Sequence, residues 1–105
     1  MTYSVVLCTC KDEKEAQKIA NHLLHDELIA CANIVENIKS LYWWEGKITS
    51  SSECMIIMKT KKSLVEDVIS SIKKMHSYKV PEVIELPIGN GNKDYLNWIS
   101  EVTKR

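Results

Sequence analysis

The order in which two hydrophobic periodicities alternate along the chain restricts its fold more than any other feature. Apolar residues recur every three to four positions in 12–24 and again in 63–75, which predicts two amphipathic helices. Short apolar runs around them predict strands at 3–10, 28–35, 53–60 and 83–86. A last short helix follows Asn92, a residue type that caps helix N-termini. Two strand-helix-strand units with right-handed crossovers predict an α+β fold of the ferredoxin-like type, βαββαβ with a C-terminal helix.

The second and third strands are expected to form an extended hairpin. Residues 38–44 continue the second strand up to Glu45 and Gly46, which carry a hairpin turn signal, and the chain returns from Ile48. The hairpin is therefore longer than the strands that precede and follow it.

Two capping boxes predict where the first two helices begin. In this motif the capping side chain bonds a backbone N–H three residues on, and the acidic residue at that position reaches back. Asp12 with Glu15 fits the motif, and so does Ser63 with Glu66.

The predicted sheet is too apolar to leave one face in water. An antiparallel sheet covered by helices on one side normally alternates apolar and polar residues, but 5–7, 28–30 and 55–58 are apolar at every position. The aromatic residues at 42–44 also point in both directions. The last helix can cover only part of this surface, so we expect a partner chain, most economically another copy of the same chain. The alternative is a monomer whose second face is covered by that helix alone.

Composition and charge exclude several classes of function. The 105 residues suit a single domain, 1–105. Fourteen basic and fourteen acidic side chains balance, which leaves no electrostatic footprint for nucleic acid or an anionic membrane. The strand expected at 53–60 also lacks the aromatic residues with which an RRM-type sheet stacks RNA bases.

The sequence also indicates a compartment. No apolar run is long enough to span a membrane, and the first ten residues lack the features of a signal peptide. We therefore expect a cytoplasmic protein, in which cysteines stay reduced. The four cysteines, expected to be free thiols, are Cys8, Cys10, Cys31 and Cys54.

Six segments together resemble the CutA family of divalent-cation tolerance proteins. They are Leu-Cys-Thr at 7–9, Ile-Ala-Cys-Ala-Asn-Ile at 29–34, Ser-Leu-Tyr-Trp-Trp-Glu-Gly-Lys-Ile at 40–48, Lys-Thr at 59–60, His-Ser-Tyr-Lys-Val-Pro-Glu at 76–82 and Tyr-Leu-Asn-Trp-Ile at 95–99. The resemblance implies a ferredoxin-like homotrimer whose long hairpin wraps a neighbouring subunit, with a role in copper or divalent-cation tolerance. Two positions depart from the family pattern: Ser77 replaces a usual proline, and Met75 stands where some members carry a second histidine.

Cys8, Met75 and His76 form the candidate metal site that the resemblance implies. Thiolate, thioether and imidazole groups are the donors that copper and related ions favour. The alternative is structural, because Cys8 lies in a strand core and Met75 falls on the apolar stripe of its helix.

Two further pairs of ligand-type residues are less favourable for metal. Cys8 and Cys10 share a strand face, but regular strand geometry holds their Cβ atoms about 6.5 to 7 Å apart. Two thiolates on one zinc ion need sulfurs about 4 Å apart, so only a bent strand end could bring them together. His22 and His25 lie opposite the apolar stripe of the first helix and are expected to be exposed polar surface.

Lys59, Tyr78, Glu82 and Trp44 form a second candidate site. If the hairpin and the loop after the second helix meet at a subunit interface, these groups could bind a small anionic or zwitterionic ligand. The alternative is a structural network in which Lys59 pairs with Glu82 and Tyr78 caps the loop.

Three functions stay open from the sequence. The first is a trimeric metal-binding protein, the second a small-molecule sensor resembling the nitrogen-regulatory PII proteins, and the third a structural trimeric scaffold. The sequence has no nucleophile elbow, P-loop or dinucleotide fingerprint, so we expect no enzymatic activity.

Overall fold

The computed structural model describes all 105 residues. Its elements, in chain order, are β1 (Tyr3–Cys10), α1 (Glu13–His25), β2 (Cys31–Trp44), β3 (Lys47–Lys61), a 3₁₀ turn η1 (Lys62–Leu64), α2 (Val65–Met75), β4 (Val83–Ile88) and α3 (Lys93–Val102). None of these helices combines the length and the apolar character that a membrane span requires.

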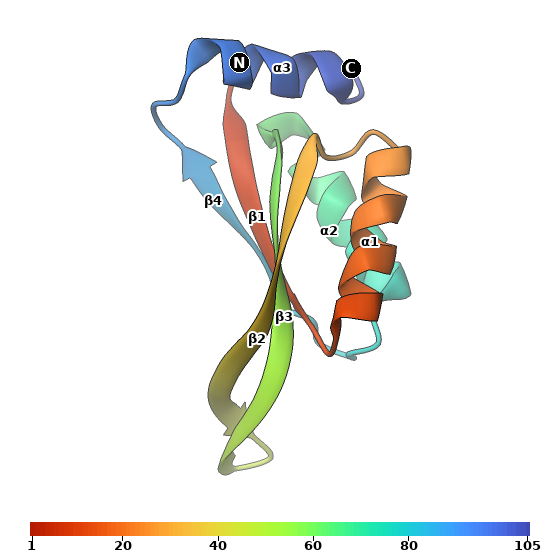
Figure 1. Cartoon of the computed structure of the whole chain (residues 1–105), viewed down its shortest axis with the longest axis vertical. Helices are drawn as coiled ribbons and strands as arrows, with labels where there is room; N and C mark the ends of the chain where they lie inside the picture. The colour runs from red at the N-terminus through yellow and green to blue at the C-terminus, as the bar shows by residue number, and fades with distance from the viewer.

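The four strands form one antiparallel sheet in the order β2-β3-β1-β4. α1 and α2 lie on one face of this sheet, whereas α3 lies across one end, next to the start of β1 (Figure 1). The ferredoxin-like fold predicted from the order of periodicities is confirmed.

The main hydrophobic core lies between the sheet and α1 and α2. Side chains alternate along a strand, so Val6, Cys8 and Cys10 of β1 all point to this side and are fully buried. The fully buried side chains that α1 and α2 contribute include Ile19, Leu23, Val68 and Ile72. Burying a side chain of this size stabilises the fold by roughly 1.5 to 3 kcal/mol. The core therefore fixes β1, and with it the two cysteines, against both helices.

β2 and β3 form the extended hairpin that the sequence predicts, and it projects far beyond the rest of the sheet (Figure 1). Pairing continues to Trp44 opposite Lys47, where Glu45 (φ 50°) and Gly46 (φ 77°) both adopt left-handed backbone angles. Two such residues match the tight turn whose twist suits a hairpin. A register shift between Val35 and Ile38 marks a β-bulge at the base of the projection.

Two expected boundaries are wrong. The second strand begins at Cys31 rather than at residue 28, because Glu27 has a left-handed backbone (φ 59°) and the Leu28 N–H still bonds the Leu23 carbonyl of α1. The capping box of Ser63 and Glu66 does not form. Ser63 lies inside η1, and α2 follows with no side-chain hydrogen bond at its N-terminus.

The open face of the sheet carries exposed apolar side chains. α3 covers only one end, where Ile99 packs on Tyr3 and Ala30. Ile84 and Leu86 of β4 stay exposed on the same face. At the hairpin tip the exposed fractions reach 70% for Leu41, 72% for Trp43 and 67% for Ile48. A single chain therefore leaves a large apolar surface uncovered.

Candidate functional site

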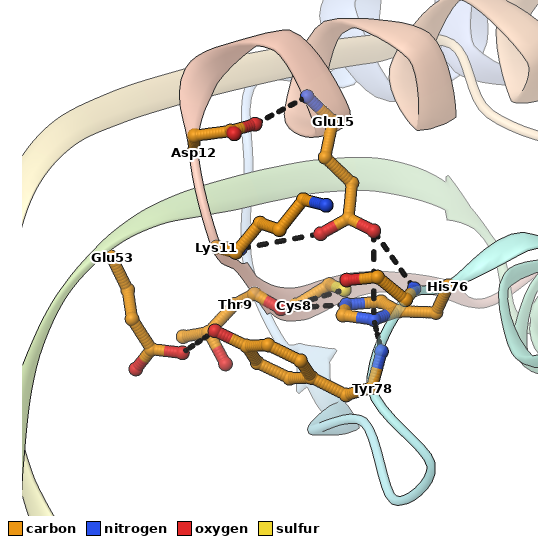
Figure 2. Close-up of polar contacts among 9 residues, drawn as sticks. Cys8, Thr9, Lys11, Asp12, Glu15, Glu53, His76 and Tyr78 are labelled. Atoms are coloured by element: carbon orange, nitrogen blue, oxygen red, sulfur yellow. Dashed lines mark hydrogen bonds and ion pairs between the residues drawn. The ribbon is translucent and has the colours of Figure 1, made fainter.

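His76 is held at the junction of α2, β1 and the loop 76–82. It follows the last residue of α2, and its side chain is completely buried. Its Nδ1 atom accepts a hydrogen bond from the Tyr78 backbone N–H at 3.0 Å, and its Nε2 atom lies 2.8 Å from the Thr9 carbonyl oxygen (Figure 2). An accepting Nδ1 carries no proton, so the ring is the neutral tautomer whose Nε2–H donates to Thr9.

Two thiols converge on this imidazole. One ring nitrogen of His76 and the sulfur atoms of Cys8 and Cys10 all lie within 4.8 Å of one another. Ligands of one ion bound at about 2.0 to 2.3 Å lie somewhat less than 4 Å apart, so a contraction of under about 1 Å would bring the three onto a common centre. The donor set fits a soft cation, because thiolate and imidazole prefer copper and related ions to hard ones.

The structure brings together two of the three predicted metal residues, Cys8 and His76. Met75 is half-buried and packs against the main core, as the structural alternative expected. Cys10 joins Cys8 and His76, although regular strand geometry argued against it. At the end of β1, pairing with β4 stops at Cys8, whereas Thr9 and Cys10 stay paired with β3.

The Cys8 thiol holds its proton firmly. A hydrogen bond with Cys10 and burial raise the pKa of the Cys8 thiol far above its ordinary value, and the charges of Glu82 and Glu15 add to the effect. A metal ion that binds Cys8 must therefore displace a tightly held proton.

Glu15 fixes the loop that carries His76. Its carboxylate accepts hydrogen bonds from the Ser77 N–H at 2.8 Å and the Lys11 N–H at 3.2 Å, and lies 4.0 Å from His76 Nδ1 (Figure 2). The expected capping box is therefore only half formed: Asp12 accepts from the Glu15 N–H at 2.9 Å, but Glu15 reaches the loop instead of Asp12. Burial acts to raise the pKa of Glu15, yet the hydrogen bonds from Ser77 and Lys11 outweigh it and lower the pKa overall.

The lowered pKa of Glu15 predicts a loss of stability in acid. A carboxylate whose pKa is lower in the folded state stabilises the fold at neutral pH, and this contribution disappears as the pH falls through the folded pKa. In Glu15→Gln, the deficit in the free energy of unfolding should be largest at pH 7 and shrink below about pH 4.5, where an unfolded Glu takes up a proton. Urea titrations across this range measure it, with the exposed Glu66→Gln as control. A deficit that is constant with pH would contradict the prediction.

Tyr78 anchors the loop 76–82 to β3. Its hydroxyl donates to Glu53 of β3 at 2.8 Å, and its ring lies 4.9 Å from the His76 ring (Figure 2). Burial and the neighbouring Glu53 carboxylate raise the pKa of Tyr78, so it stays a hydrogen-bond donor. The loop is thus tied to α1 through Glu15 and to β3 through Tyr78.

Tyr78→Phe should destabilise the protein, because it leaves the buried Glu53 carboxylate without its donor. The expected loss in the free energy of unfolding is about 1 to 3 kcal/mol, the cost of an unsatisfied buried polar group. Urea denaturation measures it. Tyr42→Phe is the matched control, since Tyr42 is partly exposed and its hydroxyl bonds only Ser51. Equal losses in the two variants would refute the role of Tyr78.

The second predicted site does not assemble within one chain. Lys59 donates to Cys31 Sγ at 3.6 Å and to Asn33 Oδ1 on the open face. Glu53, the partner of Tyr78, is six residues away along β3, roughly 20 Å. Trp44 lies another six residues on, opposite Lys47 at the tip.

Two further predictions concern the pair Lys59–Glu82 and the two histidines of α1. Lys59 forms no ion pair with the exposed Glu82, so the structural alternative for that pair is wrong. A cleft that requires a second subunit stays a prediction. His22 and His25 are exposed, as expected, and His22 pairs with Asp26 at 3.2 Å.

Comparisons with known proteins agree with the fold. Residues 4–102 match the family model described as CutA1 divalent ion tolerance protein. The divalent-cation tolerance protein CutA of Pyrococcus horikoshii is 42% identical over 101 residues, which cover 96% of this chain and 98% of that protein. The crystal structure of CutA1 from Oryza sativa superposes with a TM-score of 0.97 at 39% identity, covering 99% of this chain and 95% of that one.

Other relatives are longer. The chain spans 55 to 57% of the length of the CutA proteins of rice, Arabidopsis, mouse and human, which are 41 to 43% identical to it. The family match covers nearly the whole chain, and five of the relatives exceed 40% identity. The chain therefore belongs to the CutA1 divalent ion tolerance protein family.

Proposed function

We propose that this chain forms a trimeric metal-binding protein that contributes to copper or divalent-cation tolerance. The observation that carries the proposal is the convergence of Cys8, Cys10 and His76 within 4.8 Å. Two thiols and an imidazole are a soft donor set, which copper favours. When bound, the ion is held by these three side chains, and Glu15 and Tyr78 keep the His76 loop in place around it.

The trimer is supported by the apolar surface of the single chain. Leu41, Trp43 and Ile48 share one face of the hairpin, and an isolated two-stranded hairpin is marginally stable in water. Packing the hairpin on a neighbouring copy would remove these side chains from solvent. A closed ring of three copies would use the same contact three times.

The proposed activity is binding rather than catalysis. The His76 side chain is completely buried, so it does not face a substrate in solvent, as a general base must. An ion bound at this ring takes the place of one of its backbone partners, the Tyr78 N–H or the Thr9 carbonyl. We also propose a cytoplasmic location on the grounds of four free thiols. The family occupies several compartments, since rice and Arabidopsis relatives are described as chloroplastic and an Archaeoglobus fulgidus structure as periplasmic.

Equilibrium dialysis tests the proposed function. The protein is dialysed under argon against Cu(I), and in separate runs against Mg²⁺ and Ca²⁺, and the metal content per chain is measured. We expect Cu(I) retained at a fixed ratio and no retention of the hard ions, because the site offers no oxygen cage. Cys31→Ser is the control and should bind as the wild type does, since Cys31 lies on the opposite face. Wild-type protein that retains no Cu(I) would refute the proposal.

A sensor function is the second candidate, and the cluster on the open face favours it. Lys59 is held by Cys31 and Asn33, and the Tyr95 hydroxyl also donates to Cys31 Sγ at 3.7 Å. A cation, a phenol and an amide on a face that a partner would cover could bind a small anion between subunits. A metabolite screen by thermal shift, repeated with Lys59→Ala, tests it. The scaffold alternative holds only if neither site binds anything.

A further inference from the structure

A third thiol extends the metal site toward the surface. In the β1–β3 register, Cys54 stands directly opposite Cys10, and both side chains belong to the main core. Directly opposed residues of antiparallel strands have Cβ atoms about 4.5 to 5.5 Å apart. Cys10 Sγ in turn lies within 4.8 Å of Cys8 Sγ. The three thiols therefore form one continuous row, from Cys54 through Cys10 to Cys8.

Only one end of this row reaches solvent. Cys8 and Cys10 are fully buried, as is the His76 side chain, whereas Cys54 is 6% exposed. The loop that carries His76 is tied down by Glu15 and Tyr78. Of the three thiols in the row, Cys54 is the one with some exposed surface.

The stretch of β2 beside Cys54 also lacks regular strand pairing. The bulge of β2 falls between Val35, opposite Met55, and Ile38, opposite Glu53, so Glu36 and Asn37 flank Cys54 without regular pairing. Asn37 adopts a left-handed backbone (φ 59°). A bulge leaves a residue unpaired and redirects its side chain, and here it places Glu36 beside the thiol.

Carboxyl groups surround this entry. Asp12 and Glu13 follow Cys10, the partner of Cys54 in the register, by two and three residues, and Glu36 lies in the bulge beside Cys54. Burial and the charges of these three groups raise the pKa of the Cys54 thiol, in agreement with this placement. The neighbouring Glu13 side chain raises the pKa of Glu36, as expected for two carboxyl groups close together. None of the three forms an ion pair with a basic side chain. Unneutralised negative charge at a surface concentrates cations there.

We propose that Cys54 is the entry ligand by which a thiophilic d¹⁰ cation, such as Cu(I) or Cd²⁺, reaches the Cys8–Cys10–His76 site, with Glu13 and Glu36 concentrating the cation at this thiol. The inference rests on the proposed function. It adds a second set of sulfur and oxygen donors, nearer the surface, to the buried site.

The transfer balances without oxidation or reduction. The cation first bonds Cys54 Sγ while the thiol proton passes to a carboxylate of the Glu13–Glu36 pair and then to water. The bond to Cys10 Sγ then forms as the bond to Cys54 breaks, and the Cys10 proton returns to the Cys54 thiolate. Cys54 is thereby restored, and the charge of the cation stays unchanged.

Stopped-flow mixing of the assembled protein with Cd²⁺ tests the inference, because Cd²⁺ does not oxidise thiols and its bonds to sulfur absorb in the ultraviolet. Cys54→Ser should slow the appearance of this absorption at least about tenfold, the lower range of effects that focusing of ions at a site produces. Its final amplitude should match the wild type. Glu36→Gln, an exposed substitution that leaves the core intact, should also slow loading and weaken its dependence on salt. Cys31→Ser should load at the wild-type rate.

The other possible outcomes would contradict either the entry role of Cys54 or the proposed function. Unchanged loading rates in Cys54→Ser and Glu36→Gln, at full amplitude, would overturn the entry role alone. A lower final amplitude in Cys54→Ser would make Cys54 a permanent ligand and would also overturn it. Wild-type protein that shows no absorption would overturn the proposed function together with this inference. If Cys54→Ser fails to fold, Cys54→Ala and Glu36→Gln carry the same test.

Discussion

Replacing Cys8 and Cys10 together by serine is expected to abolish copper binding while the protein stays folded and assembled. The substitution removes two of the three donors that converge at the site and leaves only His76. Losing a group that merely orients a ligand weakens metal affinity by about 10- to 100-fold, so losing two direct ligands should weaken it by far more. Competition with a chelator of known Cu(I) affinity measures the change.

The controls for this prediction separate chemistry from packing. A buried serine hydroxyl without a partner costs about 1 to 3 kcal/mol, so Cys8→Ala with Cys10→Ala serves as a second, apolar version. Cys31→Ser removes one thiol from the opposite face of the sheet, so it should leave the copper affinity unchanged. Wild-type affinity in both double variants would show that copper binds elsewhere.

Making the hairpin tip polar is expected to dissociate the proposed trimer into single chains. Leu41, Trp43 and Ile48 share one face of the hairpin and are more than two-thirds exposed in the single chain. Each apolar side chain of this size that a partner buries contributes roughly 1.5 to 3 kcal/mol. The triple substitution to serine should therefore remove several kcal/mol from each contact and lower the measured mass from three chains to one.

Sedimentation or light scattering measures the mass, and Leu24→Ser on α1 is the matched control for removal of a partly exposed leucine. The wild-type melting temperature should also rise with protein concentration, because assembly that stabilises the folded chain follows mass action. The triple variant should lose that dependence. An unchanged mass in the triple variant would show that the hairpin is not the contact.

The fold could be predicted because its determinants are local. The stripe that carries Ile19 and Leu23 and the turn at Glu45 and Gly46 each act within a few residues, and the structure has both where they were expected. The helix start predicted at Ser63 is wrong, also for a local reason, because a 3₁₀ turn occupies the position that the capping box needs.

The candidate site could be predicted only in part. Cys8 and His76 were expected from the resemblance, and they do meet. Cys10 was set aside because regular strand geometry separates its Cβ atom from that of Cys8, and nothing in the sequence shows how close the two sulfur atoms come. The partner of His76 is the Thr9 carbonyl, 67 residues away along the chain, and such a contact leaves no periodic signal. The cleft around Lys59 requires a second subunit and stays a prediction.

Native mass spectrometry of the protein loaded with substoichiometric copper tests whether a trimer binds copper at this site, because it measures the number of chains and the metal content of the same particle. We expect a particle of three chains that retains copper in a fixed ratio. In the Cys8→Ser, Cys10→Ser double variant, the three chains should stay together and the copper should be lost. Single wild-type chains, or a wild-type three-chain particle that holds no copper, would contradict the proposed function.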